Sequence, residues 1–168
     1  MKTVARFIKK HWYQLILAAI LLGAIFLRFF KLGDVPVALY WDEAAMLVDA
    51  KSLAQTGKDM HGNHWFQAIF LSYGDYKLPV YIWLASLSVK LFGVSRFALR
   101  LPSALTGLAT ILVAVKLVPI LIKSLTNRSK PAKFKSKTIK LIQLAVALIM
   151  AISPWSLMFS RTGFEGHL

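Results

Sequence analysis

The chain has no cysteine among its 168 residues, so it can form no disulfide, no thiolate metal site and no cysteine nucleophile. Acidic residues are few, with seven Asp and Glu against 21 Lys and Arg, which gives a net charge of +14. A glycine-rich nucleotide motif, a Ser-His-Asp arrangement and an HExxH motif are also missing. These absences argue against a bound nucleotide cofactor and against the common soluble hydrolases.

What the chain has in abundance is apolar residues, which make up 57% of it and give a mean hydropathy of +0.59. These residues lie in long uncharged runs. A nucleic-acid-binding protein of the same charge would spread its basic residues over a soluble, amphipathic scaffold. The composition therefore predicts an all-α integral membrane protein whose partner is the lipid bilayer and not nucleic acid.

The charges are separated by sign along the sequence. Six of the seven acids fall between residues 34 and 75, and the seventh is Glu165. The basic residues cluster at the start of the chain and again between 123 and 140, where there is no acid. Lysine and arginine near membrane spans stay on the cytoplasmic side, so both clusters, and with them the N-terminus, are expected inside.

Four apolar stretches compete to cross the membrane. The first, 12–30, is long enough for a bilayer core of about 30 Å, and no small-residue cleavage site follows it, so we expect an uncleaved anchor. If 79–93, 97–122 and 139–159 all crossed as well, the second basic cluster would lie outside. The stretch 79–93 is the shortest and holds Lys90, which favours a helix lying in the outer interface.

The predicted topology follows from these choices, and it places Tyr81 and Trp83 of the interfacial helix at headgroup depth. The segments are a first span at 12–30, an external loop at 31–96, a second span at 97–122, a basic cytoplasmic loop at 123–138, a third span at 139–159 and the start of a second external loop at 160–168.

Within the external loop, residues 42–55 have the spacing of a helix that Gly57 ends. Five apolar residues share one face of it, and four polar residues lie off that face. The apolar set is Met46, Leu47, Ala50, Leu53 and Ala54, and the polar set is Asp49, Lys51, Ser52 and Gln55. Turn-forming residues after it leave room for a short extended piece at 65–71.

Asp42 and Glu43 stand together at the start of this helix, just above the predicted outer surface. Two adjacent carboxylates there can act as a general base with its neighbour or as oxygen ligands of a divalent cation. Acids at a helix start also serve as N-caps and complement the helix dipole. Their spacing alone leaves these interpretations open.

Three cations lie where the external loop returns to the membrane. Lys77 precedes the interfacial helix, and Arg96 and Arg100 lie four apart at the start of the second span. Each is placed to bind an anionic lipid group, and Arg96 or Arg100 could instead pair with a carboxylate of the Asp42 type. The alternative is that these side chains simply extend to the headgroup level.

Two further pairs have weaker signals. His61 and His64 lie three apart in a glycine-containing loop with no evident third ligand, so a zinc site there is disfavoured. Arg161 and Glu165 lie four apart after the last span, which fits a local ion pair or a second acidic loop facing Asp42.

The order of these pieces resembles the N-terminal module of the GT-C glycosyltransferases that use polyprenyl-phosphate sugars. Within that fold the chain is most similar to the branch of the protein O-mannosyltransferases and the aminoarabinose lipid A transferases, over residues 12–168. The motifs that carry the resemblance are 40–44 (YWDEA), 76–84 (YKLPVYIWL), 91–93 (LFG), 96–104 (RFALRLPSA), 153–155 (SPW), 159–161 (FSR) and Glu165.

The resemblance implies that Asp42 is the acid of the first external loop that acts on the acceptor, with Glu43 beside it. It implies that Lys77 binds the phosphate of the lipid carrier, helped by Arg96 or Arg100, and that 79–93 is a juxtamembrane helix. Glu165 is the candidate acid of the second external loop. Family enzymes have many more spans, so the chain is expected to be an N-terminal fragment that is inactive alone.

The activity expected from the resemblance is inverting transfer of a hexose or pentose from a polyprenyl-phosphate donor to a protein, lipid or glycan acceptor. It would take place on the outer face of a plasma membrane, in a prokaryotic cell envelope. No cofactor is required, although Asp42 and Glu165 could hold a divalent cation. The alternatives are a metal-dependent oligosaccharyltransferase-like enzyme and a non-catalytic transporter or scaffold subunit.

Overall fold

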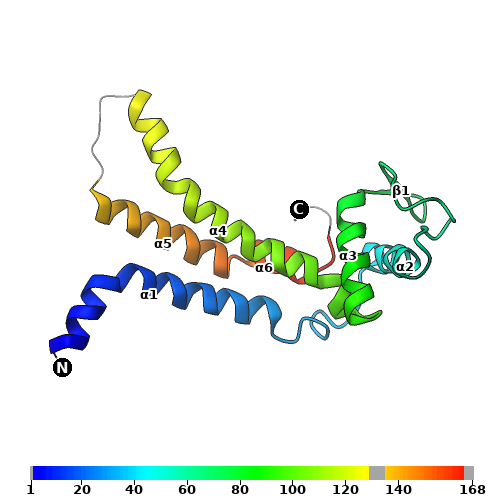
Figure 1. Cartoon of the computed structure of the whole chain (residues 1–168), viewed down its shortest axis with the longest axis horizontal. Helices are drawn as coiled ribbons and strands as arrows, with labels where there is room; N and C mark the ends of the chain where they lie inside the picture. The colour runs from blue at the N-terminus through cyan, green and yellow to red at the C-terminus, as the bar shows by residue number, and fades with distance from the viewer. Residues whose placement is uncertain (1, 129–134, 165–168) are drawn as a thin grey trace. The chain divides into compact units, whose positions relative to one another are not determined.

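The computed structural model describes residues 2–128 and 135–164, and these are predominantly helical (Figure 1). They divide into two compact units, one built from the chain up to Leu27 with Leu108–Ser156, the other from Arg28–Gly107 with the segment from Leu157. The elements are α1 (Lys2–Phe29), α2 (Trp41–Thr56), β1 (Phe70–Leu71), β2 (Tyr76–Lys77), α3 (Pro79–Phe92), α4 (Arg96–Arg128), α5 (Ser136–Ile152) and α6 (Pro154–Arg161).

Among the described residues, two helices are long and apolar enough to cross a membrane. They are Arg6–Phe29, with 24 residues, and Arg96–Leu125, with 30. At 1.5 Å per residue both exceed a bilayer core of about 30 Å. The described residues are thus mostly helical and include helices able to span a membrane, which is consistent with the prediction of an all-α membrane protein.

The third expected span, 139–159, is not one straight helix. α5 ends at Ile152, Ser153 leaves the helical conformation with ψ 125°, and α6 begins at Pro154 at an angle of 55°. Proline has no N–H for the helix ladder, and its ring disfavours a helical residue before it, so the break at Ser153 follows from the sequence. The two helices can serve as one broken span.

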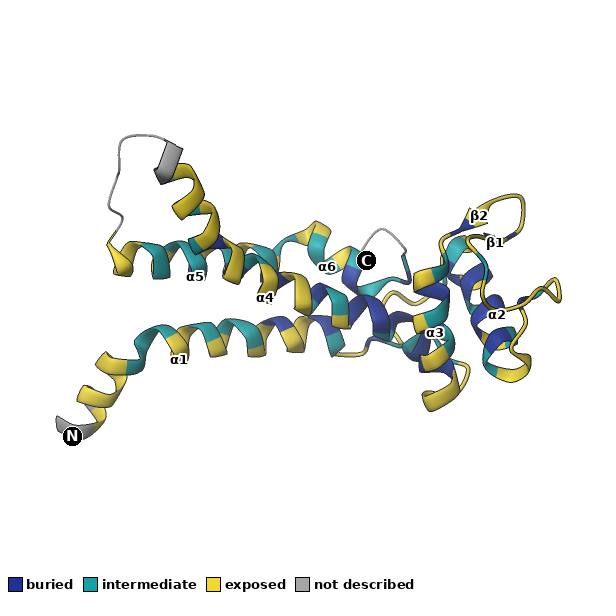
Figure 2. Ribbon diagram, turned by 45° about the horizontal axis from the view of Figure 1, so that its top comes forward, coloured by how far each residue is buried: buried dark blue, intermediate teal, exposed yellow. Residues whose placement is uncertain are grey.

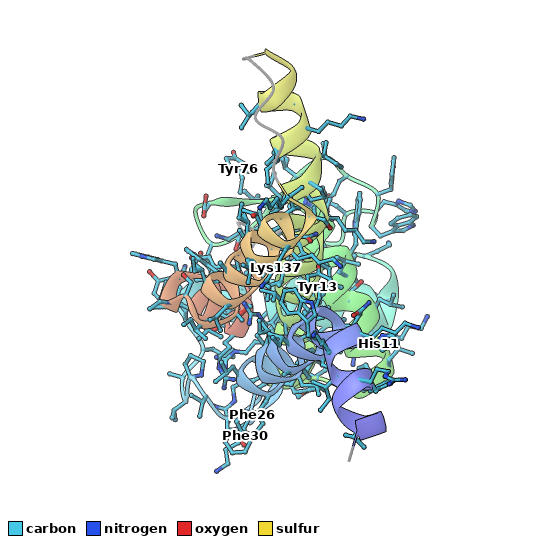
Figure 3. The ribbon with its side chains drawn as sticks, turned by 90° about the vertical axis from the view of Figure 1, so that its left-hand side faces the viewer. His11, Tyr13, Phe26, Phe30, Tyr76 and Lys137 are labelled. Carbon is cyan, nitrogen blue, oxygen red and sulfur yellow. The ribbon has the colours of Figure 1, made fainter. Side chains whose placement is uncertain are left out.

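In the first unit, α1, α4 and α5 pack through small residues that let their backbones approach closely. Ala24, Ala147 and Ala151 are buried in this core, together with Ile111 and Val115. Large apolar side chains face outwards instead, among them Leu22, Phe26, Leu121, Leu148 and Ile149. Figure 3 shows the Phe26 side chain at the outer edge of the ribbon. An apolar exterior around a small-residue core is typical of helices surrounded by lipid.

In the second unit, α2 and α3 pack against each other, and burial is concentrated there (Figure 2). Met46, Ala50 and Leu53 of α2 meet Ile82 and Ala85 of α3 in the core, as the apolar face of 42–55 predicts. The backbone N–H of Gly57, whose φ is 71°, then donates to the Leu53 carbonyl at 3.0 Å and ends the helix. One prediction for α2 is wrong, because Asp49 is fully buried and does not lie off the packed face.

Between α2 and α3 the predicted extended piece is much shorter than expected. β1 and β2 form a hairpin with two residues in each strand, in which Phe70 pairs with Lys77 and Leu71 with Tyr76. The side chain of Phe70, in β1, is fully buried. The hairpin therefore fixes Lys77 one residue before the N-cap of α3, which is Leu78.

Tyr81, which the sequence predicts at headgroup depth, directs its side chain into the protein interior and not outwards. Its side chain is fully buried, and its hydroxyl donates to the Leu99 carbonyl at 2.7 Å and accepts from Ser103 Oγ at 3.1 Å. Burial raises the pKa of Tyr81 above its ordinary value. The residue therefore joins α3 to the start of α4 from inside the unit.

Candidate functional site

Lys77 lies between two carboxylates. Its Nζ is 2.6 Å from Asp42 Oδ1 and 2.8 Å from Asp75 Oδ2. The lysine side chain is 8% exposed, that of Asp42 is 25% exposed and that of Asp75 is 63% exposed. The cluster is thus a largely buried cation with one sheltered and one solvent-facing partner.

Local folding explains how residues 35 positions apart meet. Asp42 is in the first turn of α2, where the exposed N-H groups of a helix start favour an acid. Asp75 lies in the bend just before β2 and Lys77 ends that strand, and the lysine side chain turns back to bond the Asp75 carboxylate. Packing of α2 on α3 brings the start of α2, with Asp42, within reach of the same ammonium.

The electrostatics of the cluster keep Lys77 protonated. Burial alone would lower its pKa, but the bonds from Asp42 and Asp75 outweigh burial and raise it above the ordinary value. The bond from Lys77 likewise lowers the pKa of Asp75. With two carboxylates on one ammonium the cluster has a net charge of −1. A carboxylate with a movable cation at hydrogen-bond distance can take a proton while the cation stabilises charge elsewhere.

Glu43, the neighbour of Asp42, belongs to a different and deeper pair. Arg100 donates from Nε to Glu43 Oε1 at 2.7 Å and from Nη2 to Oε2 at 3.0 Å, and both side chains are at most 1% exposed. The remaining guanidinium donors of Arg100 bind the carbonyls of Leu32, Pro36 and Ala38. The arginine therefore clamps the chain that leads into α2.

The other carboxylate contacts of Glu43 come from backbone N–H groups. Gly163 donates to Oε1 at 2.8 Å and Tyr40 to Oε2 at 3.0 Å. Burial would raise the pKa of Glu43, but the bonds from Arg100, Gly163 and Tyr40 together hold it below its ordinary value. Glu43 is a charged structural anchor and does not face Lys77.

These contacts revise the expected role of Arg100 in binding a carrier phosphate. The side chain is fully buried, and its five N–H donors are directed at Glu43 and at three backbone carbonyls. An anion could reach the guanidinium only by displacing this buried pair, which carries a large penalty. Of the three interpretations given for Arg100 from the sequence, the carboxylate partner is correct, and the carboxylate is that of Glu43.

Arg96 and Arg161 also bind the segment between α1 and α2. Arg96 Nη1 donates to the Val37 carbonyl, and Arg161 Nη2 donates to the carbonyls of Phe30 and Val35, both at 2.9 Å. Arg161 is therefore committed to backbone oxygens, while its expected partner Glu165 lies outside the described residues.

The ring nitrogens of His61 and His64 meet backbone groups and not the Lys77 cluster. His61 Nε2 is 3.1 Å from the Leu71 carbonyl, and His64 Nδ1 accepts from the Phe66 N–H at 3.3 Å. Within residues 2–128 and 135–164 no three His, Asp or Glu side chains gather as metal ligands. The Asp42 carboxylate, a candidate cation ligand, is bonded to the Lys77 ammonium.

No family model, curated protein or solved structure matches this chain.

Sequence reasoning missed several contacts of this region. Asp75 could have been considered as a partner of Lys77 because an acid two residues from a lysine is a local signal. Gly163 and the pairing of Tyr81 with Ser103 have no local sequence signal, because each depends on segments far apart in the chain.

Proposed function

We propose that this chain is part of a membrane glycosyltransferase that moves a sugar from a polyprenyl-phosphate donor to an acceptor at the membrane surface. The observation that carries the proposal is the buried Lys77 ammonium held 2.6 Å from the Asp42 carboxylate. The pair offers an anion-binding cation and a proton acceptor side by side. The resemblance of residues 40–44 and 76–84 to GT-C enzymes supports the same two roles.

In the proposed reaction an acceptor hydroxyl or amine attacks the anomeric carbon of the donor sugar. A bond forms between the acceptor atom and that carbon, and the bond from the carbon to the carrier phosphate oxygen breaks. Asp42 takes the proton from the acceptor atom, and the phosphate leaves with the electron pair of the broken bond. Direct displacement predicts inversion at the anomeric carbon, because no enzyme nucleophile intervenes.

The pairing of Asp42 with Lys77 suits this change of charge. When Asp42 gains a proton it becomes neutral and no longer attracts the ammonium, while the leaving phosphate gains a negative charge. Lys77 can then transfer its hydrogen bond from Asp42 to the phosphate, which stabilises the leaving group as charge develops. Asp75, 2.8 Å away, keeps Lys77 charged and positioned during the transfer.

The proposal assigns a lipid, glycan or protein acceptor and a hexose or pentose donor. It places the site on the outer face of a prokaryotic plasma membrane, with the N-terminus inside, as the distribution of basic residues favours. A carrier monophosphate needs no metal to balance a diphosphate, so a divalent cation would be auxiliary.

Lys77 and a matched conservative variant provide the test. Polyprenyl monophosphate binding is measured on the purified protein in nanodiscs for the wild type, Lys77→Ala and Lys77→Arg. We expect Lys77→Ala to lose binding and Lys77→Arg to retain part of it, because arginine keeps the charge with a different geometry. Equal binding by Lys77→Ala would refute the carrier role.

A parallel assay of sugar transfer separates the alternatives. Transfer that continues in a metal chelator supports the monophosphate donor, whereas loss of transfer favours the metal-dependent oligosaccharyltransferase-like enzyme. A protein that binds no polyprenyl phosphate and transfers no sugar in its full-length form would instead be the scaffold or transporter subunit.

A further inference from the structure

The segment between α2 and the hairpin carries two exposed aromatic residues that the proposed reaction does not use. Trp65 is 46% exposed and Phe66 is 71% exposed. Both contact the same residue of α3: the Phe66 ring stacks on Trp83 with ring centroids 6.0 Å apart, and the Trp65 ring meets it edge-on at 6.1 Å. Trp83 Nε1 also donates to the Trp65 carbonyl at 2.9 Å. We call Trp65, Phe66 and Trp83 the aromatic tip.

Internal hydrogen bonds hold together the loop that presents the aromatic tip. Asp59 accepts from the Asn63 N–H at 2.7 Å and from Gln67 Nε2 at 2.8 Å. Burial would raise the pKa of Asp59, but bonds from Gln67, Asn63 and His61 lower it, so the carboxylate stays charged as the centre of the loop. Lys58 and His64 close the loop through a backbone bridge. Two large aromatic side chains are therefore held outwards by a built scaffold.

The aromatic tip adjoins an apolar face of α3. Leu87 and Leu91 are 55% and 68% exposed, and Leu84 lies beside them. Leu87 lines a cavity of about 310 Å³ with Trp65, Trp83 and Lys90, and it also lines one of about 460 Å³ between α3 and the first turns of α4. One continuous apolar surface thus runs from the aromatic tip, across α3, to α4.

The membrane is the occupant that this continuity indicates. α4 is long and apolar enough to span a bilayer, and only three residues separate it from α3. α3 itself has 14 residues, or about 21 Å of helix, which is short of a bilayer core of about 30 Å. Tryptophan beside apolar and lysine side chains is the composition that membrane interfaces favour.

We infer that the aromatic tip inserts at headgroup depth into the leaflet that the N-terminal end of α4 enters, and so anchors the loop 57–71 to the bilayer. The inference is independent of sugar transfer. It assigns Trp65 and Phe66 to lipid contact, with Trp83 as the residue that fixes their depth and Lys90 at the rim to meet lipid phosphate.

The absence of cysteine allows a direct measurement, because single cysteines can be labelled without removing native ones. An environment-sensitive fluorophore is attached at Phe66→Cys or at Gln55→Cys, and the protein is placed in phosphatidylcholine nanodiscs with or without lipids that carry a nitroxide at the headgroup. Gln55 is the matched control, since it is an exposed residue of α2. We expect several-fold stronger lipid quenching and a blue-shifted emission at position 66.

A second variant controls for a fluorophore that partitions into the membrane by itself. Trp83→Phe keeps an aromatic ring but removes the N–H that holds the Trp65 carbonyl, so quenching at position 66 should fall in that background. Equal lipid quenching at positions 55 and 66 would overturn the inference. The inference would also be overturned if the probe at position 66 were shielded from aqueous iodide but not quenched by the lipid nitroxide. Protein would then cover the aromatic tip.

Discussion

Glu43 and Arg100 form a two-point ion pair, at 2.7 and 3.0 Å, that joins the first turn of α2 to the second turn of α4. Neither side chain is more than 1% exposed. The pair lies one residue away from Asp42, the proposed base, and it is the contact that fixes where α2 begins relative to α4 within this unit. Its strength therefore bears on the geometry of the Lys77 cluster as well as on folding.

Glu43→Gln should destabilise the protein strongly. The amide cannot neutralise the Arg100 guanidinium, so a buried charge is left without its partner at a cost of about 3–5 kcal/mol. The measurement is thermal unfolding of the purified protein in detergent. Asp42→Asn serves as control, because Asp42 is part-exposed and its partner Lys77 keeps the bond to Asp75. A similar melting temperature for both variants would contradict the role given to Glu43.

Gly163→Ala should destabilise the protein without changing any charge. A Cβ at this position would lie 3.1 Å from Tyr81 Oη and 3.2 Å from Leu99 Cγ. Tyr81 cannot easily yield, because its hydroxyl is bonded to Leu99 and Ser103, so we expect a loss of about 1–3 kcal/mol.

Gly23→Ala is the matched control for that change. No atom lies within 4 Å of a Cβ built at Gly23, and the residue is in the middle of α1, where alanine is the better helix former. The same thermal assay should show no loss of stability for Gly23→Ala. Equal effects of the two substitutions would mean that the close packing around Gly163 is not rigid.

The sequence predicts the regular elements of this chain well, because hydrophobic periodicity and terminating residues are local signals. The α2 helix, its end at Gly57 and the length of α3 all follow from such signals. Long-range polar pairs do not follow from local signals. Nothing near Arg100 indicates that it bonds Glu43, 57 residues away, and nothing near Tyr81 indicates that it turns towards Leu99. The sequence predicts Asp49 off the packed face because a polar residue at the edge of such a face is normally solvated, whereas the structure buries it.

The burial of Asp49 predicts a pH dependence. Burial and the nearby charge of Asp59 raise its pKa, outweighing the Met60 N–H bond and the charge of His61, and its Oδ2 has no hydrogen-bond partner among the described residues. The folded state then binds this proton more tightly than the unfolded chain. Its contribution to stability is full below the ordinary pKa of about 3.9 and is lost as pH rises through the raised folded pKa.

Asp49→Asn isolates that contribution from those of the other carboxylates. Asparagine cannot ionise, so the variant should gain stability relative to the wild type as pH increases from about 4 towards neutral. The readout is the difference between the two melting temperatures at each pH, which cancels the opposite trend from Glu43, Asp59 and Asp75. A difference that stays constant with pH would show that Asp49 titrates normally.

The last prediction uses Asp42→Asn to separate two properties of one side chain. If Asp42 and a phosphate compete for the Lys77 ammonium, removing the aspartate charge should strengthen binding of polyprenyl monophosphate, because Lys77 then loses one of its two anionic partners. If Asp42 is also the base, the same variant should lower sugar transfer by about 10²- to 10⁴-fold, since an amide takes no proton at neutral pH.

Opposite effects on binding and transfer are the signature of this arrangement. They should be measured on the same full-length membrane preparation, together with Asp75→Asn, whose exposed carboxylate makes its influence on phosphate binding smaller. In a Lys77→Ala background the gain in binding from Asp42→Asn should disappear, because the shared cation is gone. Weaker phosphate binding by Asp42→Asn would show that Asp42 positions Lys77 for the phosphate and does not compete for it, whereas transfer within a few-fold of wild type would remove Asp42 as the base.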